Sequence, residues 1–127
     1  EITGEKIDDV FETEITVNDF DKACKIFEDC NVKSKSYQEN KREEWTYNNN
    51  IFITIDTWPG LSPFIEIESE SIEAIKKFTE ILGYSYEKGI IGSIDIVYEK
   101  VLGISKQEII TLPEITFDKI PTKNSLK

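Results

Sequence analysis

Apolar and polar residues alternate along three stretches of the chain, and this alternation predicts strands. Side chains two residues apart point to the same face of a strand, so each stretch has one largely apolar face and one largely polar face. A fourth stretch is more polar but rich in Tyr, Trp and Thr, which favours a strand as well. The predicted strands cover residues 10–17, 36–47, 51–56 and 64–69.

Apolar residues at helical spacing predict an amphipathic helix after the first strand. Phe20, Ala23, Cys24 and Phe27 recur at i, i+3, i+4 and i+7, and the pattern extends to about residue 30. Asn18 is the predicted N-cap residue, because its side chain can accept a bond from a backbone N–H of the first turn.

Two further helices are predicted in the second half of the chain. One begins near Ser71 and ends at Gly83, and the other runs from a Ser93 cap to Gly103. Glycine is the usual residue where a helix ends in a left-handed conformation. From Lys106 onward we predict no regular element. The order β-α-β-β-β-α-α, with a hairpin turn at residues 48–50, indicates an α+β fold with antiparallel pairing.

Length, charge and cysteines limit the classes of function. The chain has 127 residues, which suits one domain, and a net charge of −10. That charge argues against nucleic-acid and membrane partners, whereas excess carboxylate suits a magnesium or manganese site. Cys24 and Cys30 are six residues apart on one predicted helix and face different sides, so we expect buried or semi-buried free thiols in a reducing compartment. Without an apolar span or signal peptide, a cytoplasmic location is expected.

The candidate chemistry lies in residues 40–68. Glu66 and Glu68 share one face of a strand, and Asp56 lies on the polar face of the preceding one. Two interpretations remain open: a half-exposed sheet with its acids in water, or acids lining the lumen of a barrel whose isoleucines pack outward against helices. Lys41 and Arg42 are the nearest dense basic positions. They could grip phosphate or be ordinary surface charges.

The same segment resembles the CYTH family, the triphosphate tunnel metalloenzymes that include class IV adenylyl cyclases, thiamine triphosphatase and inorganic tripolyphosphatases. The resemblance rests on the runs YQENKREEW, IDTWPGLSPFIEIES and GSIDIVYEKVLGI, and on the helix ending LGY between the last two. It covers most of the chain up to about Ile104. The pattern Asp-x-x-Pro-Gly-Leu-x-x-Phe-x-Glu-x-Glu, from Asp56 to Glu68, is its most specific part.

The resemblance implies an eight-stranded antiparallel β-barrel, the triphosphate tunnel, with flanking helices. Residues 1–127 would be a single domain lacking the family's first strands, with residues 105–127 as a C-terminal extension. Either a longer protein supplies those strands, or a homodimer or partner strands complete the barrel. The ligand would be a small triphosphate compound.

The resemblance also assigns roles to residues. Asp56, Glu66 and Glu68 match metal ligands, with Glu66 and Glu68 catalytic. Arg42 matches a phosphate-binding arginine, and Lys41 would assist it. The family usually has a basic residue two positions before that arginine, where this chain has an asparagine.

Two acids of the first predicted strand, Glu12 and Glu14, are candidate tunnel acids. They depart from the family's Glu-x-Glu-x-Lys signature, because Thr16 stands in place of the lysine. The implied function is Mg²⁺- or Mn²⁺-dependent hydrolysis of inorganic tripolyphosphate or of a nucleoside or other organic triphosphate. The alternatives are an adenylyl cyclase that forms cyclic AMP and pyrophosphate, and a catalytically inactive polyphosphate-binding module. Trp58 is expected to pack at the barrel rim, with ligand stacking as its alternative role, and Tyr98 to pack within its helix.

Overall fold

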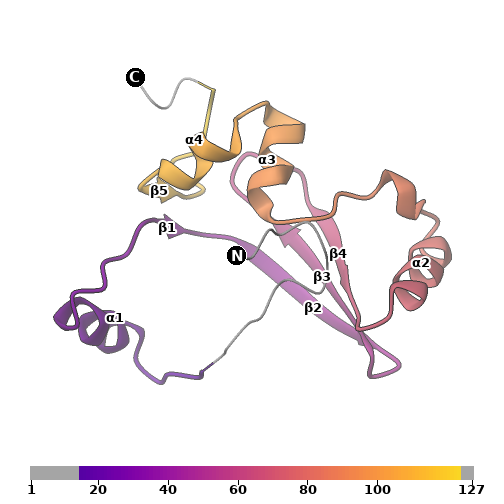
Figure 1. The fold of residues 1–127 in the computed structure, drawn as a ribbon, viewed down its shortest axis with the longest axis horizontal. Helices are drawn as coiled ribbons and strands as arrows, with labels where there is room; N and C mark the ends of the chain where they lie inside the picture. The colour runs from indigo at the N-terminus through magenta and orange to yellow at the C-terminus, as the bar shows by residue number, and fades with distance from the viewer. Residues whose placement is uncertain (1–14, 124–127) are drawn as a thin grey trace. The chain divides into compact units, whose positions relative to one another are not determined.

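The computed structural model describes residues 15–123, shown in colour in Figure 1. The chain divides into two compact units, Glu1–Lys35 and Ser36–Lys127. Among the described residues, no helix is both long and apolar enough to cross a membrane.

The first unit contains helix α1, Phe20–Asp29. Its N-cap is Asp19 and not the predicted Asn18, because the Asp19 carboxylate accepts a bond of 2.9 Å from the backbone N–H of Lys22. Residues 15–17 are not a strand, and the rest of the strand predicted over 10–17 lies outside the described residues. No residue of α1 is buried. Cys24 is half-buried, as predicted, but Cys30 is exposed, and both are free thiols.

Three antiparallel strands form the main sheet of the second unit: β2 (Lys41–Tyr47), β3 (Ile51–Thr57) and β4 (Phe64–Glu68). They lie side by side in the order β2-β3-β4 (Figure 1). The predicted turn is confirmed, since Asn48 and Asn49 have φ values of 51° and 59°. The α+β class is therefore confirmed. This sheet has three strands and is not closed into a barrel within residues 15–123.

The single strand predicted over residues 36–47 is wrong, because the structure divides it between two sheets. Strand β1, Tyr37–Gln38, pairs in parallel with β5, Glu114–Ile115, and β2 begins only at Lys41. The interruption at Glu39 has a physical cause. Its backbone N–H donates to the carbonyl of Ile115 at 3.0 Å, and its carboxylate accepts from the backbone N–H of Phe117 at 3.3 Å.

The two later helices are confirmed. Helix α2 covers Ile72–Ile81 and α3 covers Ile94–Leu102, with a short 3₁₀ helix η2, Tyr86–Lys88, between them. Ser71 caps α2 by accepting a bond of 3.2 Å from the backbone of Ala74. Gly83 and Gly103 follow the two helices with φ values of 83° and 65°, the left-handed conformation that glycine adopts without strain.

The prediction that no element follows Lys106 is wrong. Helix α4, Lys106–Thr111, begins with a capping box in which the Ser105 hydroxyl and the Glu108 carboxylate each bond the other's backbone N–H. Strand β5 follows it. The Ser-x-x-Glu spacing of Ser105 and Glu108 is the sequence motif of a capping box, from which the start of this helix could be predicted.

The hydrophobic core lies among the loop after β3, helices α3 and α4, and β5. Trp58 and Phe64 pack against it from the side of the sheet. Its buried members are Leu61, Tyr98, Ile104, Ile109, Leu112 and Ile115.

Among the described residues, helix α2 covers one end of the isoleucine face of the sheet. There Ile51 is buried, and the rings of Tyr47 and Phe78 lie 5.0 Å apart, which brings α2 onto the sheet. Further along the same face Ile55 and Ile65 remain 36% and 37% exposed. Helix α2 therefore packs against one end of this face, while Ile55 and Ile65 at the other end are exposed.

Candidate functional site

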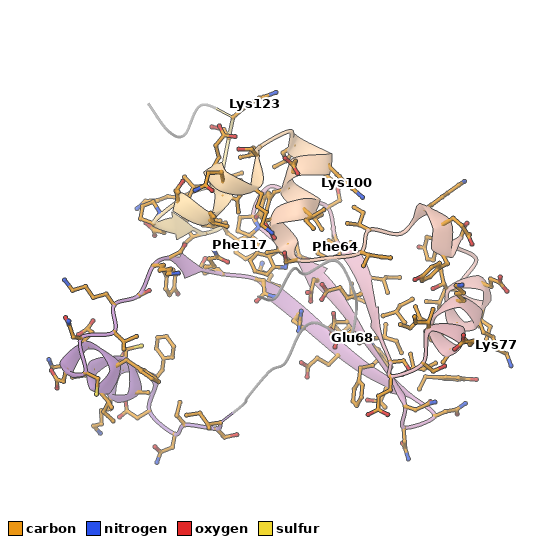
Figure 2. All side chains as sticks on the ribbon, viewed as in Figure 1. Phe64, Glu68, Lys77, Lys100, Phe117 and Lys123 are labelled. Atoms are coloured by element: carbon orange, nitrogen blue, oxygen red, sulfur yellow. The ribbon has the colours of Figure 1, made fainter. Side chains whose placement is uncertain are left out.

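The strand register places four of the predicted site residues, Arg42, Asp56, Glu66 and Glu68, on one face of the sheet. Arg42 pairs with Asp56, and Thr54 pairs with Glu66. In Figure 2, Phe64 and Glu68 mark the two ends of β4. This polar face comprises Arg42, Glu44, Thr46, Phe52, Thr54, Asp56, Phe64, Glu66 and Glu68.

Arg42 is the only arginine of the chain, and it joins two of the predicted acids. Its Nε donates to Asp56 Oδ1 at 2.8 Å and its Nη2 to Asp56 Oδ2 at 2.6 Å, a bidentate pair. The same Nη2 donates to Glu66 Oε2 at 2.9 Å, reaching across β3. The bonds that Arg42 makes to described residues come from Nε and Nη2.

Asp56 lies where the polar face meets the hydrophobic core, and its side chain is 1% exposed. Its register partner is Phe64, whose ring packs against the core cluster. Burial by itself would raise the pKa of Asp56. The bonds and the charge of Arg42, with smaller contributions from Glu66 and Trp58, outweigh burial and hold the pKa below its usual value. Asp56 is thus an anion kept in a water-poor position by its partners.

The pKa of Glu66 is shifted in the opposite direction. Partial burial and the nearby charge of Asp56 raise the pKa of Glu66, although Arg42 acts to lower it. Thr54 supports Glu66 through its hydroxyl, 3.4 Å from Oε2. Asp56 and Glu66 thus have pKa values shifted in opposite directions, and both are bonded to the guanidinium of Arg42. Such a pair of carboxylates can bind a divalent cation or exchange a proton.

The other predicted residues are less closely associated. Lys41 lies on the opposite side of β2 from Arg42, and its Nζ is 4.8 Å from the centre of the Phe117 ring. The structure therefore does not bring Lys41 together with Arg42. Glu68 shares the polar face but is exposed. Glu12 and Glu14 lie outside the described residues.

The donor set fits a divalent cation only in part. Within residues 15–123, no three His, Cys, Asp or Glu side chains are grouped to hold a metal ion. Both oxygens of Asp56 are engaged by Arg42. Glu66 and Glu68 remain as hard oxygen ligands on one face, and Mg²⁺ commonly uses one or two carboxylates together with waters and substrate phosphates. These two residues would hold the cation, and Asp56 could join them only if Arg42 moved.

Sequence reasoning missed one contact that fixes the site. The Tyr98 hydroxyl donates to the carbonyl oxygen of Pro59 at 2.8 Å, which ties α3 to the loop after β3. Tyr98 is fully buried and Trp58 is half-buried against the core, as packing roles predict. The two bonded positions are 39 residues apart, and no local pattern indicates such a pairing.

No protein-family model matches this chain, and no curated protein or solved structure matches it either.

Proposed function

We propose that the polar face is part of a site for divalent-metal-dependent hydrolysis of a triphosphate compound. The observation that carries the proposal is the position of the only arginine, between a buried aspartate and a glutamate with a raised pKa. A tunnel of eight strands, implied by the sequence resemblance, would require strands beyond β2, β3 and β4.

Each described residue has a chemical task in this proposal. Arg42 would donate from Nη1 to a phosphate oxygen and offset the charge that builds on the leaving group. Glu66 would orient a water and accept its proton. Glu66 and Glu68 would hold Mg²⁺ or Mn²⁺, which when bound polarises a phosphate oxygen. The reaction forms a bond from water oxygen to the terminal phosphorus and breaks the bridging P–O bond, releasing orthophosphate.

A second candidate function is polyphosphate binding without turnover. It is favoured by the low number of cations at the site, since Lys41 is turned to the other face of β2. One guanidinium would offset little of the charge of a triphosphate, so binding would depend strongly on an added divalent cation.

The test is product analysis after incubation with tripolyphosphate, and separately with ATP, in the presence of Mg²⁺ or Mn²⁺. Orthophosphate release that is lost in Glu66→Gln and retained in Glu80→Gln is expected. Glu80 is an exposed glutamate of α2, so it controls for the loss of one charge. Cyclic AMP with pyrophosphate would identify a cyclase instead. Tight tripolyphosphate binding without product would favour the binding module, and unchanged turnover in Glu66→Gln would refute the assigned role.

A further inference from the structure

The strand that carries Arg42 is held at its beginning by the C-terminal part of the chain. Strand β1 pairs with β5, and the backbone N–H of Glu39 extends this pairing by donating to the carbonyl of Ile115 at 3.0 Å (Figure 1). The Glu39 carboxylate accepts a bond of 3.3 Å from the backbone N–H of Phe117. Residue 39 is therefore bonded to the 115–117 segment through both its backbone and its side chain.

The ring of Phe117 contacts the first residue of β2. Lys41 Nζ lies 4.8 Å from the centre of this ring, and Figure 2 shows Phe117 beside the beginning of β2. A cation over an aromatic face is attracted to it. Ile115 belongs to the hydrophobic core and is 1% exposed, so the segment that makes these contacts is anchored in the core.

Arg42 needs this support because it lies near the end of its strand. It is the second residue of β2, and its partner Asp56 is the penultimate residue of β3. Strand ends open more easily than strand centres, because fewer neighbouring bonds hold them. At the opposite end the two strands are joined by the turn at residues 48–50, whereas at Arg42 the chain enters β2 from β1.

We infer that Glu39 is a positioning residue for Arg42. Its bonds to the 115–117 segment keep the beginning of β2 closed against β3, so that the Arg42 guanidinium stays bonded to Asp56 and Glu66. The consequence for phosphate binding rests on the proposed function, but the positioning of Arg42 does not.

The bond from Phe117 to Glu39 requires an acceptor oxygen at the end of a side chain of this length, and not a negative charge. Glutamine has such an oxygen and no charge, whereas aspartate has the charge but its oxygens lie one methylene closer to the backbone. Glu39→Gln is therefore expected to preserve the position of Arg42, and Glu39→Asp and Glu39→Ala to loosen it. A purely electrostatic role would give the reverse order for Gln and Asp.

The chain has one arginine, so a ¹⁵N-correlated NMR spectrum contains a single Arg Nε–H signal. In Glu39→Ala and Glu39→Asp this signal is expected to shift and to exchange with solvent about tenfold faster, the factor that corresponds to one lost hydrogen bond. In Glu39→Gln the exchange rate should stay within about twofold of wild type. The Trp45 indole signal, assigned with Trp45→Phe, should not move, because Trp45 lies further along β2 and donates to Glu43 at 3.0 Å.

Glu99→Ala is the matched control, because Glu99 is an exposed glutamate of α3, and it should leave the Arg42 signal unchanged. An unmoved Arg42 signal in a folded Glu39→Ala variant would overturn the inference. If Glu39→Ala does not fold, Glu39→Asp and Glu39→Gln decide: equal Arg42 signals in the two, or a wild-type signal only in Glu39→Asp, would refute the hydrogen-bonding role. A Trp45 signal that moves together with that of Arg42 would show general unfolding in place of positioning. Failure of the triphosphate assay would leave these signals unaffected, so the two ideas fail separately.

Discussion

Replacing Arg42 with methionine tests whether the ion pair at the polar face stabilises the fold. The variant keeps much of the apolar stem but removes the two nitrogens that donate to Asp56, leaving a carboxylate that is 1% exposed without its main partner. Breaking a fully buried pair in this way costs about 3–5 kcal/mol, whereas an exposed pair is worth at most about 1 kcal/mol.

The structure places the Arg42 pair between these limits. The Arg42 side chain is 38% exposed and Glu66 is 37% exposed, so water reaches one side of the network. We therefore expect a loss of about 2–3 kcal/mol at neutral pH, which lowers the urea midpoint by about 1 M.

The loss must also depend on pH. The pKa of Asp56 is lowered in the folded protein, so its stabilising contribution is present above the unfolded value of about 3.9 and is lost as the pH falls through the folded pKa. In the variant, burial would raise the pKa of Asp56, and the carboxyl would take up a proton at a higher pH. The difference in free energy of unfolding between variant and wild type is therefore expected to decrease as the pH falls. The decrease should begin above the ordinary pKa of aspartate.

Urea unfolding followed by tryptophan fluorescence measures this gap, because both tryptophans lie in the unit 36–127. Lys41→Met removes one positive charge from the next residue of the same strand, and its cation–π contact with Phe117 is worth only about 0.5–1 kcal/mol. If Arg42→Met costs no more than Lys41→Met, or if its cost is the same at about pH 7 and about pH 4, the reasoning about a buried, partner-dependent Asp56 is wrong.

Three further predictions concern the packing around the site, each measured by urea or thermal unfolding. Ile109 is 2% exposed and Ile110 is 49% exposed. Ile109→Ala should therefore lower the free energy of unfolding by about 2–5 kcal/mol, and Ile110→Ala by less than about 1 kcal/mol. Equal losses would contradict the position of the core. Gly60→Ala should destabilise more than Gly83→Ala, because both have positive φ but only at Gly60 would a Cβ meet a side chain, at 2.7 Å; the reverse order would show that the loop is not closely packed. Ser105→Ala should cost about 0.5–2 kcal/mol by removing the α4 cap, and no change would mean that the capping box is unimportant.

Local patterns in the sequence were sufficient to predict most of the elements. The alternation in β3 and β4 and the asparagine turn identified the hairpins, because strand period and turn chemistry are properties of a few adjacent residues. The same alternation put Glu66 and Glu68 on one face and Asp56 on the polar face of its strand. Capping signals likewise fixed both ends of α2.

The pairing of distant segments was not predictable in this way. The sequence shows no sign that residues 36–47 divide between two sheets, since β1 forms only by pairing with β5 from the other end of the chain. Lys41 and Arg42 look equivalent in the sequence, and only the strand register separates them onto opposite faces.

Sequence by itself determined the α+β class, the positions of the hairpins and the common face of the site acids. Only the tertiary structure decided that Asp56 is buried, that Arg42 bonds both Asp56 and Glu66, and that Tyr98 holds the loop beside them. The reason is physical: face and turn follow from backbone geometry over a few residues, whereas burial and ion pairing depend on which distant side chains exclude water.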